Sequence, residues 1–168
     1  MMISIAPEQP EQRPHVLALN RLAFEGEDEA RIIEALSREG LCVLSLVAAD
    51  GAKVTGHILF SSLDVEVDDR KVEAVALAPM AVLQAYQGKG IGSALVRRGL
   101  ELLAAQDVEA VIVVGHTDFY PRFGFSAERV RHIASPFQGR DAYMGLELKP
   151  AALVGERGEC RYPEAFEL

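Results

Sequence analysis

The stretch between residues 72 and 114 constrains the fold more than any other part of the sequence. It contains the apolar run Val72–Leu83, the glycine-rich segment Gln87–Gly92 and a second apolar run, Ala110–Val114. Between the last two, apolar residues recur at helical spacing, which predicts an amphipathic helix. The helix residues that we expect to be buried are Leu95, Val96, Leu100 and Leu103. A strand, a helix and a largely β-branched strand in this order predict a parallel crossover unit, and therefore an α/β fold.

The flanking segments predict further strands and helices. Two segments with the apolar periodicity of helices lie between Pro14 and Leu36, separated by the acidic stretch Glu25–Glu29. Asp50-Gly51 between apolar runs predicts a hairpin turn. On the helices we expect a buried face formed by Val16, Leu19, Leu22, Ala23, Ile32, Ile33 and Leu36. The other predicted elements are strands at Met1–Ala6, Leu41–Ala49, Val54–Leu63, Phe125–Val130 and Tyr143–Leu148, and a short helix or turn at Asp118–Phe123. One α/β domain over residues 1–168 accounts for the sequence.

Composition and charge argue against several classes of protein. A net charge of −8 repels nucleic acid, so we expect no nucleic-acid partner. No apolar run approaches the roughly 20 residues of a membrane-spanning helix, and the start lacks the features of a signal peptide. We therefore expect a cytoplasmic protein without a membrane partner. The cysteines Cys42 and Cys160 and the four histidines lack the spacing of metal ligands, so no metal is expected.

The segment Gln87–Gly92 has the properties of an anion site. Its three glycines allow a tight turn and close approach by a ligand, and the helix that follows offers unpaired N–H groups and the positive end of its dipole. The nucleotide P-loop pattern is absent. The dinucleotide fingerprint also fails, because Ser93 stands where its third glycine belongs and Gln84–Gln87 separates the loop from the strand. A dinucleotide-binding oxidoreductase is therefore disfavoured.

The pattern Gln87-x-x-Gly90-x-Gly92 resembles the coenzyme A signature of the GNAT superfamily of N-acetyltransferases. The strand end Met80–Val82 before it also resembles the family pattern, as does Tyr120-Pro121-Arg122-Phe123-Gly124-Phe125 about 30 residues further on. With the ending Arg161–Phe166, the chain looks most like the YhbS-like branch of this family. The resemblance implies a single-domain GNAT fold, with a central, mixed but mostly antiparallel sheet that is splayed at the cofactor site and flanked by helices.

The resemblance also implies a function and a set of site residues. We expect an acetyl-CoA-dependent N-acetyltransferase that acts on a primary amine of a small molecule, a peptide or a protein. Tyr120 is the candidate general acid, and the N–H of Val82, near the interruption expected at Pro79, is the candidate oxyanion donor. If Pro79 has no such role, it marks an edge strand or a packing bulge. The residues implied in binding coenzyme A are Met80, Ala81, Val82, Gln87, Gly88, Lys89, Gly90, Ile91, Gly92, Ser93 and Tyr120.

The general base stays open at the level of sequence. Some family members carry a glutamate six residues before the position of Val82, and this chain has Ala76 there. His116 is a candidate base, because its ordinary pKa lies near 6.5, and an ordered water relay is equally compatible. His57 is expected to be half-exposed or structural.

Two further questions have alternative answers. The absence of a glutamate at position 76 leaves a second hypothesis, a non-catalytic module that senses coenzyme A or regulates a partner. The protein is expected to be a monomer or a homodimer. Its segment Cys160–Leu168 packs either across a dimer or back on its own sheet.

Overall fold

Hydrogen-bonded strands form a mixed sheet with the order β1-β2-β3-β4-β5-β7, and the short strands β6 and β8 pair beside this path. The computed structural model describes residues 1–167. The strands are β1 (Ile3–Pro7), β2 (Cys42–Asp50), β3 (Lys53–Val67), β4 (Arg70–Val82), β5 (Ala110–Val114), β6 (Ile133–Ala134), β7 (Tyr143–Glu147) and β8 (Gly158–Arg161). The α-helices are α1 (Arg13–Phe24), α2 (Asp28–Arg38) and α3 (Ile91–Ala105). The 3₁₀-helices are η1 (Pro10–Gln12), η2 (Gln84–Tyr86), η3 (Tyr120–Phe123), η4 (Glu128–Val130) and η5 (Glu164–Phe166).

Most of the pairings with a defined register are antiparallel, and the parallel pairs are β4 with β5 and β6 with β8. The predicted mixed, mostly antiparallel sheet with flanking helices is therefore confirmed, and so is the crossover from β4 through α3 to β5. By its internal contacts the chain divides into two units. The first holds Met1–Ser61 and Ala78–Glu101 with the residues from Ala165, and the second holds Ser62–Leu77 and Leu102–Glu164. That the whole chain forms one domain stays a prediction.

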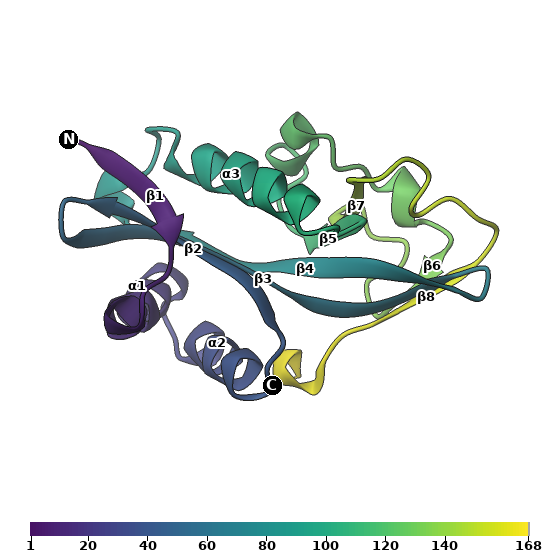
Figure 1. Cartoon of the computed structure of the whole chain (residues 1–168), viewed down its shortest axis with the longest axis horizontal. Helices are drawn as coiled ribbons and strands as arrows, with labels where there is room; N and C mark the ends of the chain where they lie inside the picture. Colours follow the sequence, from purple (N-terminus) through teal and green to yellow (C-terminus); the bar gives the residue numbers. More distant parts are fainter. Residues whose placement is uncertain (168) are drawn as a thin grey trace. The chain divides into compact units, whose positions relative to one another are not determined.

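In the first unit, helices cover both faces of β2 and β3. Figure 1 shows α1 and α2 on one face and the first part of α3 on the other. Leu59 of β3 joins Val16, Leu19 and Ile33 in the core beneath α1 and α2. Because side chains alternate along a strand, the neighbouring positions of β3 face α3. The structure confirms the predicted hairpin. It also confirms the two N-terminal helices and the break between them.

One part of the predicted buried face is wrong. Leu22 is 69% exposed, and Ala23 is exposed as well. The physical reason is that α1 ends at Phe24, where Glu25 takes up a left-handed conformation. The buried stripe of α1 therefore consists of Val16, Leu19 and the polar Asn20.

Close approach of α3 to β3 depends on two glycines. A Cβ added at Gly99 of α3 would lie 2.5 Å from the ring of Phe60, and one at Gly56 of β3 would lie 3.1 Å from Ile91. Phe60 is fully buried, so its ring has no room to move away. The absence of these two side chains thus sets the distance between the helix and the strand.

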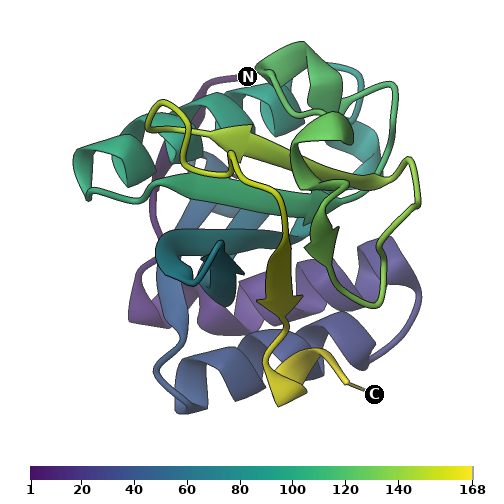
Figure 2. The ribbon, with the colours of Figure 1, turned by 90° about the vertical axis from the view of Figure 1, so that its right-hand side faces the viewer.

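In the second unit, β8 extends the sheet. It pairs antiparallel with β3, from Asp64↔Arg161 to Val67↔Gly158, and parallel with β6. Figure 2 shows the olive β8 next to the green β6. Of the two arrangements expected for the C-terminal segment, Cys160 and its neighbours adopt the one on the chain's own sheet.

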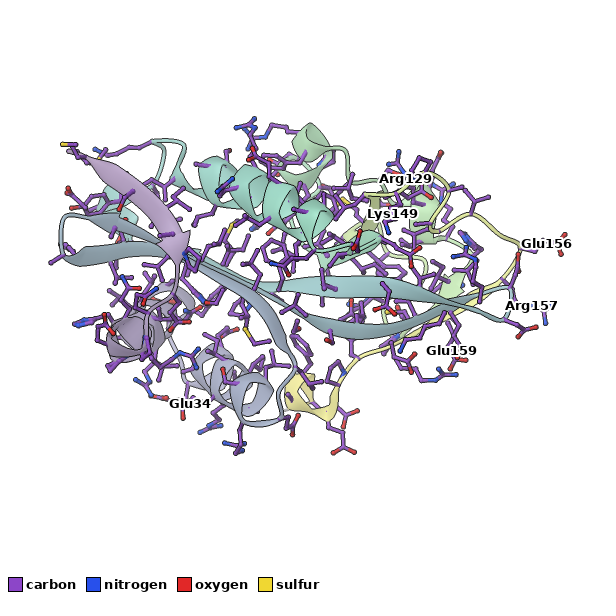
Figure 3. All side chains as sticks on the ribbon, in the orientation of Figure 1. Glu34, Arg129, Lys149, Glu156, Arg157 and Glu159 are labelled. Carbon is purple, nitrogen blue, oxygen red and sulfur yellow. The ribbon has the colours of Figure 1, made fainter. Side chains whose placement is uncertain are left out.

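A carboxylate fixes the segment that leads into β8. The side chain of Asp68, in the turn between β3 and β4, accepts backbone N–H groups of Glu156 at 3.1 Å and Arg157 at 3.2 Å. These hydrogen bonds lower the pKa of Asp68. The side chains of Glu156 and Arg157 project outward from this segment (Figure 3). Only their backbone is therefore used to hold β8 in register.

The predicted strand at Phe125–Val130 is wrong. Ser126 makes one isolated bridge to Gly145, and residues from Glu128 onward form η4. Phe125 and Val130 are both buried, so the apolar ends of the segment imitate a strand. Val130 packs over Gly145, where a Cβ would lie 2.7 Å from its side chain, and the turn is what brings it there. Within residues 1–167, no helix is both long and apolar enough to cross a membrane.

We predict that Gly99→Ala lowers the free energy of unfolding by about 1–3 kcal/mol, because the added methyl group overpacks the contact with Phe60. Alanine is otherwise the better helix former by about 1 kcal/mol, so the sign of the change is diagnostic. Urea denaturation measures it. Glu101→Ala, on the exposed side of α3, is the control and should change stability by less than about 0.5 kcal/mol. A more stable Gly99→Ala protein would contradict the close packing of α3 on β3.

Candidate functional site

The end of β4 lies outside the parallel ladder. Pairing of β4 with β5 runs from Ala74↔Ala110 to Ala76↔Ile112, whereas β4 continues to Val82. The N–H of Leu83 donates to the carbonyl of Thr55 in β3 at 2.9 Å. Since successive peptide groups of an extended chain face opposite sides, the N–H of Val82 faces away from β3. The backbone of Val82 is thus oriented as an oxyanion donor would require, and that role stays a prediction.

The side chain of Gln87 connects this strand end to the glycine loop. Its Nε2 donates to the carbonyl oxygen of Val82 at 3.0 Å. The sequence singled out Gln87 as part of the loop, but it did not indicate this bond. The bond spans five residues, so it limits how far the start of the loop moves from β4.

Two glycines of the loop need their conformational freedom. Gly88 has φ = 74° and Gly90 has φ = 83°, in the left-handed region that favours glycine. A Cβ at either position would meet nothing within 4 Å, so each position opens into free space. Gly92, in contrast, lies in the first turn of α3. The turn therefore requires Gly88 and Gly90, and it does not require Gly92.

A row of backbone N–H groups follows from this turn. The carbonyl of Gly90 accepts the first helical hydrogen bond, from Ala94 at 3.0 Å. Among residues 1–167, no acceptor is found for any of the backbone N–H groups from Gly88 to Ser93. Unpaired amides at the start of a long helix attract an anion, and the helix dipole adds to this. The segment therefore has the properties of an anion site.

The loop is also anchored on its N-terminal side. Tyr86, the last residue of η2, donates its hydroxyl to the carboxylate of Asp50 at 2.8 Å, and Nζ of Lys53 lies 5.5 Å from the centre of its ring. The hydrogen bond to Asp50 raises the pKa of Tyr86. Asp50 and Lys53 flank the β2–β3 hairpin turn, so this turn fixes η2. No pattern in the sequence indicates this contact between residues 36 positions apart.

Tyr120 lies in the second unit, after β5. Its ring is 6% exposed and packs edge-on against Phe119 and Phe125, with centroids 5.0 and 5.7 Å away. A Cβ at Gly115 would lie 2.4 Å from this ring, so the ring rests directly on the backbone. Burial raises the pKa of Tyr120 to about 12. Within residues 1–167, its hydroxyl has no hydrogen-bond partner. The phenol thus keeps its proton at neutral pH and is free to donate it.

His116 lies in the turn before Tyr120. Its carbonyl accepts the N–H groups of Phe119 and Tyr120 at 3.2 and 3.3 Å, and its side chain is exposed. The turn therefore places both candidate catalytic residues within the second unit. Ala76 is buried in β4, and the exposed Glu73 lies at the start of that strand, where it binds Glu109 through its backbone N–H.

The histidine and cysteine side chains show no shared ligand geometry. Among residues 1–167, no group of three or more His, Cys, Asp or Glu side chains has a suitable arrangement for a metal ion. Cys42 and Cys160 are both free thiols. Burial raises the pKa of Cys160 to about 12, which leaves it as an unreactive thiol within β8.

Comparison with known proteins identifies relatives over nearly the whole chain. Residues 8–125 match the model of the acetyltransferase (GNAT) family. The chain is 34% identical over 164 residues to the uncharacterized N-acetyltransferase YhbS of Escherichia coli K12, covering 96% of this chain and 97% of that protein. It is also 37% identical over 105 residues to the uncharacterized N-acetyltransferase YjhQ of the same strain, covering 61% of this chain and 58% of the relative.

Solved structures agree with this relationship. The structure of YhbS from Escherichia coli in complex with CoA superposes with a TM-score of 0.90 at 33% identity, over 99% of this chain and 92% of the other. A GNAT family acetyltransferase from Brucella melitensis in complex with acetyl-CoA has a TM-score of 0.81 at 29% identity, over 99% of both chains. Both superpositions cover the glycine loop Gln87–Gly92 and the turn that carries Tyr120.

We predict that Gly90→Ala and Gly92→Ala have opposite effects on stability. A left-handed conformation costs an alanine about 1–2 kcal/mol, so Gly90→Ala should lower the free energy of unfolding by that amount. Gly92→Ala should raise it by up to about 1 kcal/mol, because alanine favours the helix. Chemical denaturation of the two variants side by side provides the measurement. Equal effects would show that the loop does not turn at Gly90.

Proposed function

Since this chain belongs to the GNAT family of acetyltransferases, we propose that it transfers the acetyl group of acetyl-CoA to a primary amine of a small molecule, a peptide or a protein. We also propose that residues 1–168 act as one N-acetyltransferase domain. The observation that carries the proposal is the row of unpaired amides from Gly88 to Ser93, in the part of the chain that matches the family.

The loop amides are suited to the pyrophosphate of coenzyme A. The groups from Gly88 to Ser93 have no acceptor among the described residues, and the glycines leave free space in front of the backbone. The exposed Lys89 adds a positive charge to the same segment. The CoA and acetyl-CoA complexes of the two related proteins support this use of the site. The backbone of Met80–Val82 would hold the pantetheine arm in the manner of an added strand.

The reaction requires a donor for the oxygen of the thioester carbonyl. As the amine nitrogen bonds to the carbonyl carbon, negative charge develops on this oxygen. The N–H of Val82 faces away from β3, and the β4–β5 ladder ends at Ala76, so this N–H is our candidate donor. A backbone donor is already oriented and needs no rearrangement during the reaction.

Tyr120 is our candidate general acid. When the carbon–sulfur bond breaks, the thiolate takes up a proton, and a phenol with a pKa near 12 holds one at neutral pH. Proton transfer from such a phenol is favoured only if the thiolate is desolvated as well, since burial raises the pKa of a thiol too. The Tyr120 hydroxyl has no partner within residues 1–167, so it is available to donate its proton to the thiolate.

The proton that the amine loses needs a base. Ala76 carries no proton-accepting group, and Glu73 is engaged at the start of β4 through its backbone. Our candidate is the exposed imidazole of His116, with an ordered water relay as the alternative. The two are distinguished by His116→Ala, which removes the first and leaves the second.

A second candidate function is a non-catalytic module that senses coenzyme A. The buried Ala76, in place of a glutamate found in some family members, is the observation that favours it. Both functions require cofactor binding, and only the enzyme releases thiol from acetyl-CoA in the presence of a panel of primary amines. Thiol release above the rate without amine supports the transferase, and its absence across the panel supports the sensor.

We predict that CoA or acetyl-CoA stabilises the protein against heat. Binding to the native state adds about 2.7 kcal/mol at a hundredfold excess of ligand over Kd, which corresponds to a rise in Tm of about 5–10 °C for a chain of this size. Differential scanning fluorimetry with CoA, NAD and ATP makes the comparison. A shift with NAD and none with CoA would rule out the proposed use of the loop.

Gly92→Val tests whether the shift with CoA depends on the loop amides. Its position is helical, so valine is tolerated by the backbone, whereas Gly90→Val would be strained even without ligand. The branched side chain next to the amide row should abolish the shift with CoA while the Tm without ligand changes little.

We predict that Tyr120→Phe lowers kcat by roughly 10²–10⁴-fold and leaves the KM for acetyl-CoA nearly unchanged, because a proton donor acts only in the transition state. The hydroxyl has no partner within residues 1–167, so its removal leaves no buried group unpaired and stability should be retained. Steady-state kinetics on any amine that is turned over separates the two constants. A drop in kcat of less than about threefold would remove Tyr120 from the mechanism.

A further inference from the structure

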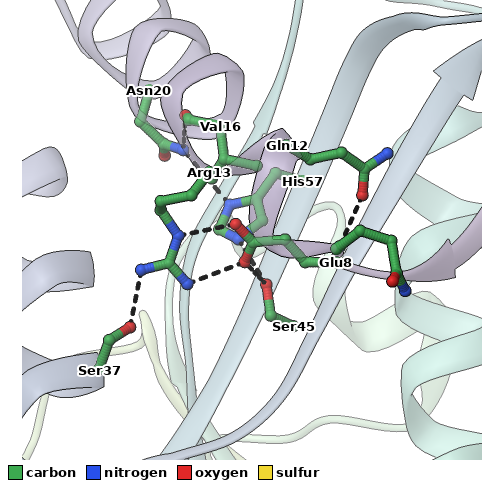
Figure 4. Close-up of polar contacts among 9 residues, drawn as sticks. Glu8, Gln12, Arg13, Val16, Asn20, Ser37, Ser45 and His57 are labelled. Atoms are coloured by element: carbon green, nitrogen blue, oxygen red, sulfur yellow. Dashed lines mark hydrogen bonds and ion pairs between the residues drawn. The ribbon is translucent and has the colours of Figure 1, made fainter.

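Residues of α1, β2 and β3 in the first unit meet in a network of polar side chains that the proposed mechanism does not use (Figure 4). The carboxylate of Glu8 accepts two hydrogen bonds from Arg13, at 2.7 and 3.0 Å, and one from the hydroxyl of Ser45 at 2.7 Å. Arg13 also donates to the hydroxyl of Ser37 in α2 at 2.8 Å. Glu8 is thus a fully engaged acceptor at one end of the network.

His57 and Asn20 form the other end. Both residues are fully buried. Nε2 of His57 lies 3.1 Å from Oγ of Ser45, and Nδ1 lies 3.3 Å from Nδ2 of Asn20, which also donates to the carbonyl of Val16 at 2.9 Å. An amide NH₂ only donates, so Nδ1 of His57 is the acceptor and carries no proton. The neutral imidazole therefore carries its proton on Nε2 and donates it to Ser45, whose hydroxyl is committed to Glu8.

The charges around His57 come from several elements. Burial lowers the pKa of His57 to about 4; it outweighs the carboxylate of Glu8, which raises this pKa, and acts in the same direction as Arg13. Glu34 of α2 and Cys42 of β2 interact electrostatically with Arg13, and neither is among the charges that shift the pKa of His57. The neighbouring end of β4 contributes only apolar residues, such as Ala81, to this core.

Protonation of Nδ1 would break the junction between the helix and the strand. Without rearrangement, two donors would face each other 3.3 Å apart. If the Asn20 amide turned over, its Oδ1 would accept from Nδ1 but would then face the carbonyl of Val16, acceptor against acceptor. Oδ1 now has no partner among the described residues. Either arrangement loses at least one hydrogen bond that α1 makes with β3 or within itself.

The junction lies close to the strand end of the candidate site. Val16 and Leu19, one turn before and one residue before Asn20 on α1, share a core with Ala81 and Leu83. Val82 lies between these last two residues. A shift of α1 on β3 would therefore change the packing on both sides of the candidate oxyanion donor.

We propose that Asn20 and His57 are positioning residues, which hold α1 against the strand end that carries Val82 only while Nδ1 of His57 is unprotonated. The effect on Val82 as a cofactor-binding residue rests on the proposed function, whereas the junction itself does not. Because the unfolded imidazole takes up a proton near pH 6.5 and the folded one only near pH 4, stability decreases as the pH falls through this interval.

The tautomer of His57 is the direct test of the junction. In ¹⁵N-labelled protein, long-range ¹H–¹⁵N spectra should show Nδ1 of His57 unprotonated and Nε2 protonated from pH 8 down to about pH 5. A proton on Nδ1, or titration of His57 near pH 6.5, would overturn the proposal. This readout needs no cofactor, so it stays informative even if CoA does not bind, an outcome that would refute the proposed function instead.

Asn20→Asp tests the positioning. A carboxylate facing Nδ1 attracts a proton, so His57 should titrate at least one pH unit higher than in the unchanged protein. The Kd for CoA, measured by calorimetry at pH 7, should rise at least fivefold. The matched control is Ser61→Ala, which removes a buried hydroxyl of β3 that has no partner among the described residues. It should leave both quantities unchanged. A changed His57 titration with an unaltered Kd would overturn the positioning role.

Hydrogen exchange on the unchanged protein covers the case in which Asn20→Asp does not fold. After correction for the intrinsic exchange rates, the amides of Ala81 and Leu83, on either side of Val82, and those of α1 should lose protection together as the pH falls through the titration of His57. Protection that stays constant through that titration would overturn the proposal.

Discussion

The contact between α3 and β3 is the constraint on which the candidate site depends. Gly56 and Gly99 remove the side chains that would keep the helix and strand apart, and Phe60 fills the space that remains. The position of α3 determines where its first turn lies, and with it the unpaired amides that follow Gly90. A helix held further from the strand would keep the same sequence in its loop, but the amides would no longer lie beside the end of β4. The position of the loop amides thus depends on packing in the core.

Local patterns in the sequence were sufficient for most of the architecture. The strand Ala110–Val114 was predicted with its true bounds, and the parallel crossover, the β2–β3 hairpin and the glycine loop all follow from short-range signals. Each of these follows from the order and pattern of segments that are consecutive in the chain. The family resemblance rested on the same segment, and the match of residues 8–125 confirms it.

The errors and omissions share a different cause, because they depend on contacts between distant residues. Periodicity put Leu22 on the buried face, but Leu22 lies in the last turn of α1 and is exposed, and Asn20 is buried instead. The strands β6 and β8 are too short to show a pattern, and they form because β3 offers an edge to β8 and β8 in turn pairs with β6. Likewise, nothing near Tyr86 in the sequence indicates that Asp50 binds its hydroxyl. Such a contact forms only because the fold brings the two residues together.

Two histidines show how strongly surroundings decide what a residue can do. His57 is buried with both ring nitrogens engaged, and the resulting pKa of about 4 makes it a fixed part of the core. The side chain of His116 is exposed and leaves its nitrogens available. The sequence distinguishes the two only by position, because His116 lies just before the Tyr120–Phe125 motif and His57 lies on the second strand of the hairpin. Burial and hydrogen bonding separate them far more clearly, because one imidazole is enclosed in the core and the other is open to solvent.

The late position of β8 in the chain has a consequence for biosynthesis. β8 pairs with residues Asp64–Val67 of β3, where Val65 and Val67 are fully buried. A ribosome makes the N-terminal part first, so these residues leave the exit tunnel long before β8 exists to pair with them. Throughout that interval the nascent chain presents an open, apolar strand edge, which is the kind of surface that joins strands of neighbouring chains. The charged residues Asp64 and Glu66 alternate with the two valines, and charges at such positions oppose the pairing of an open strand edge with another chain.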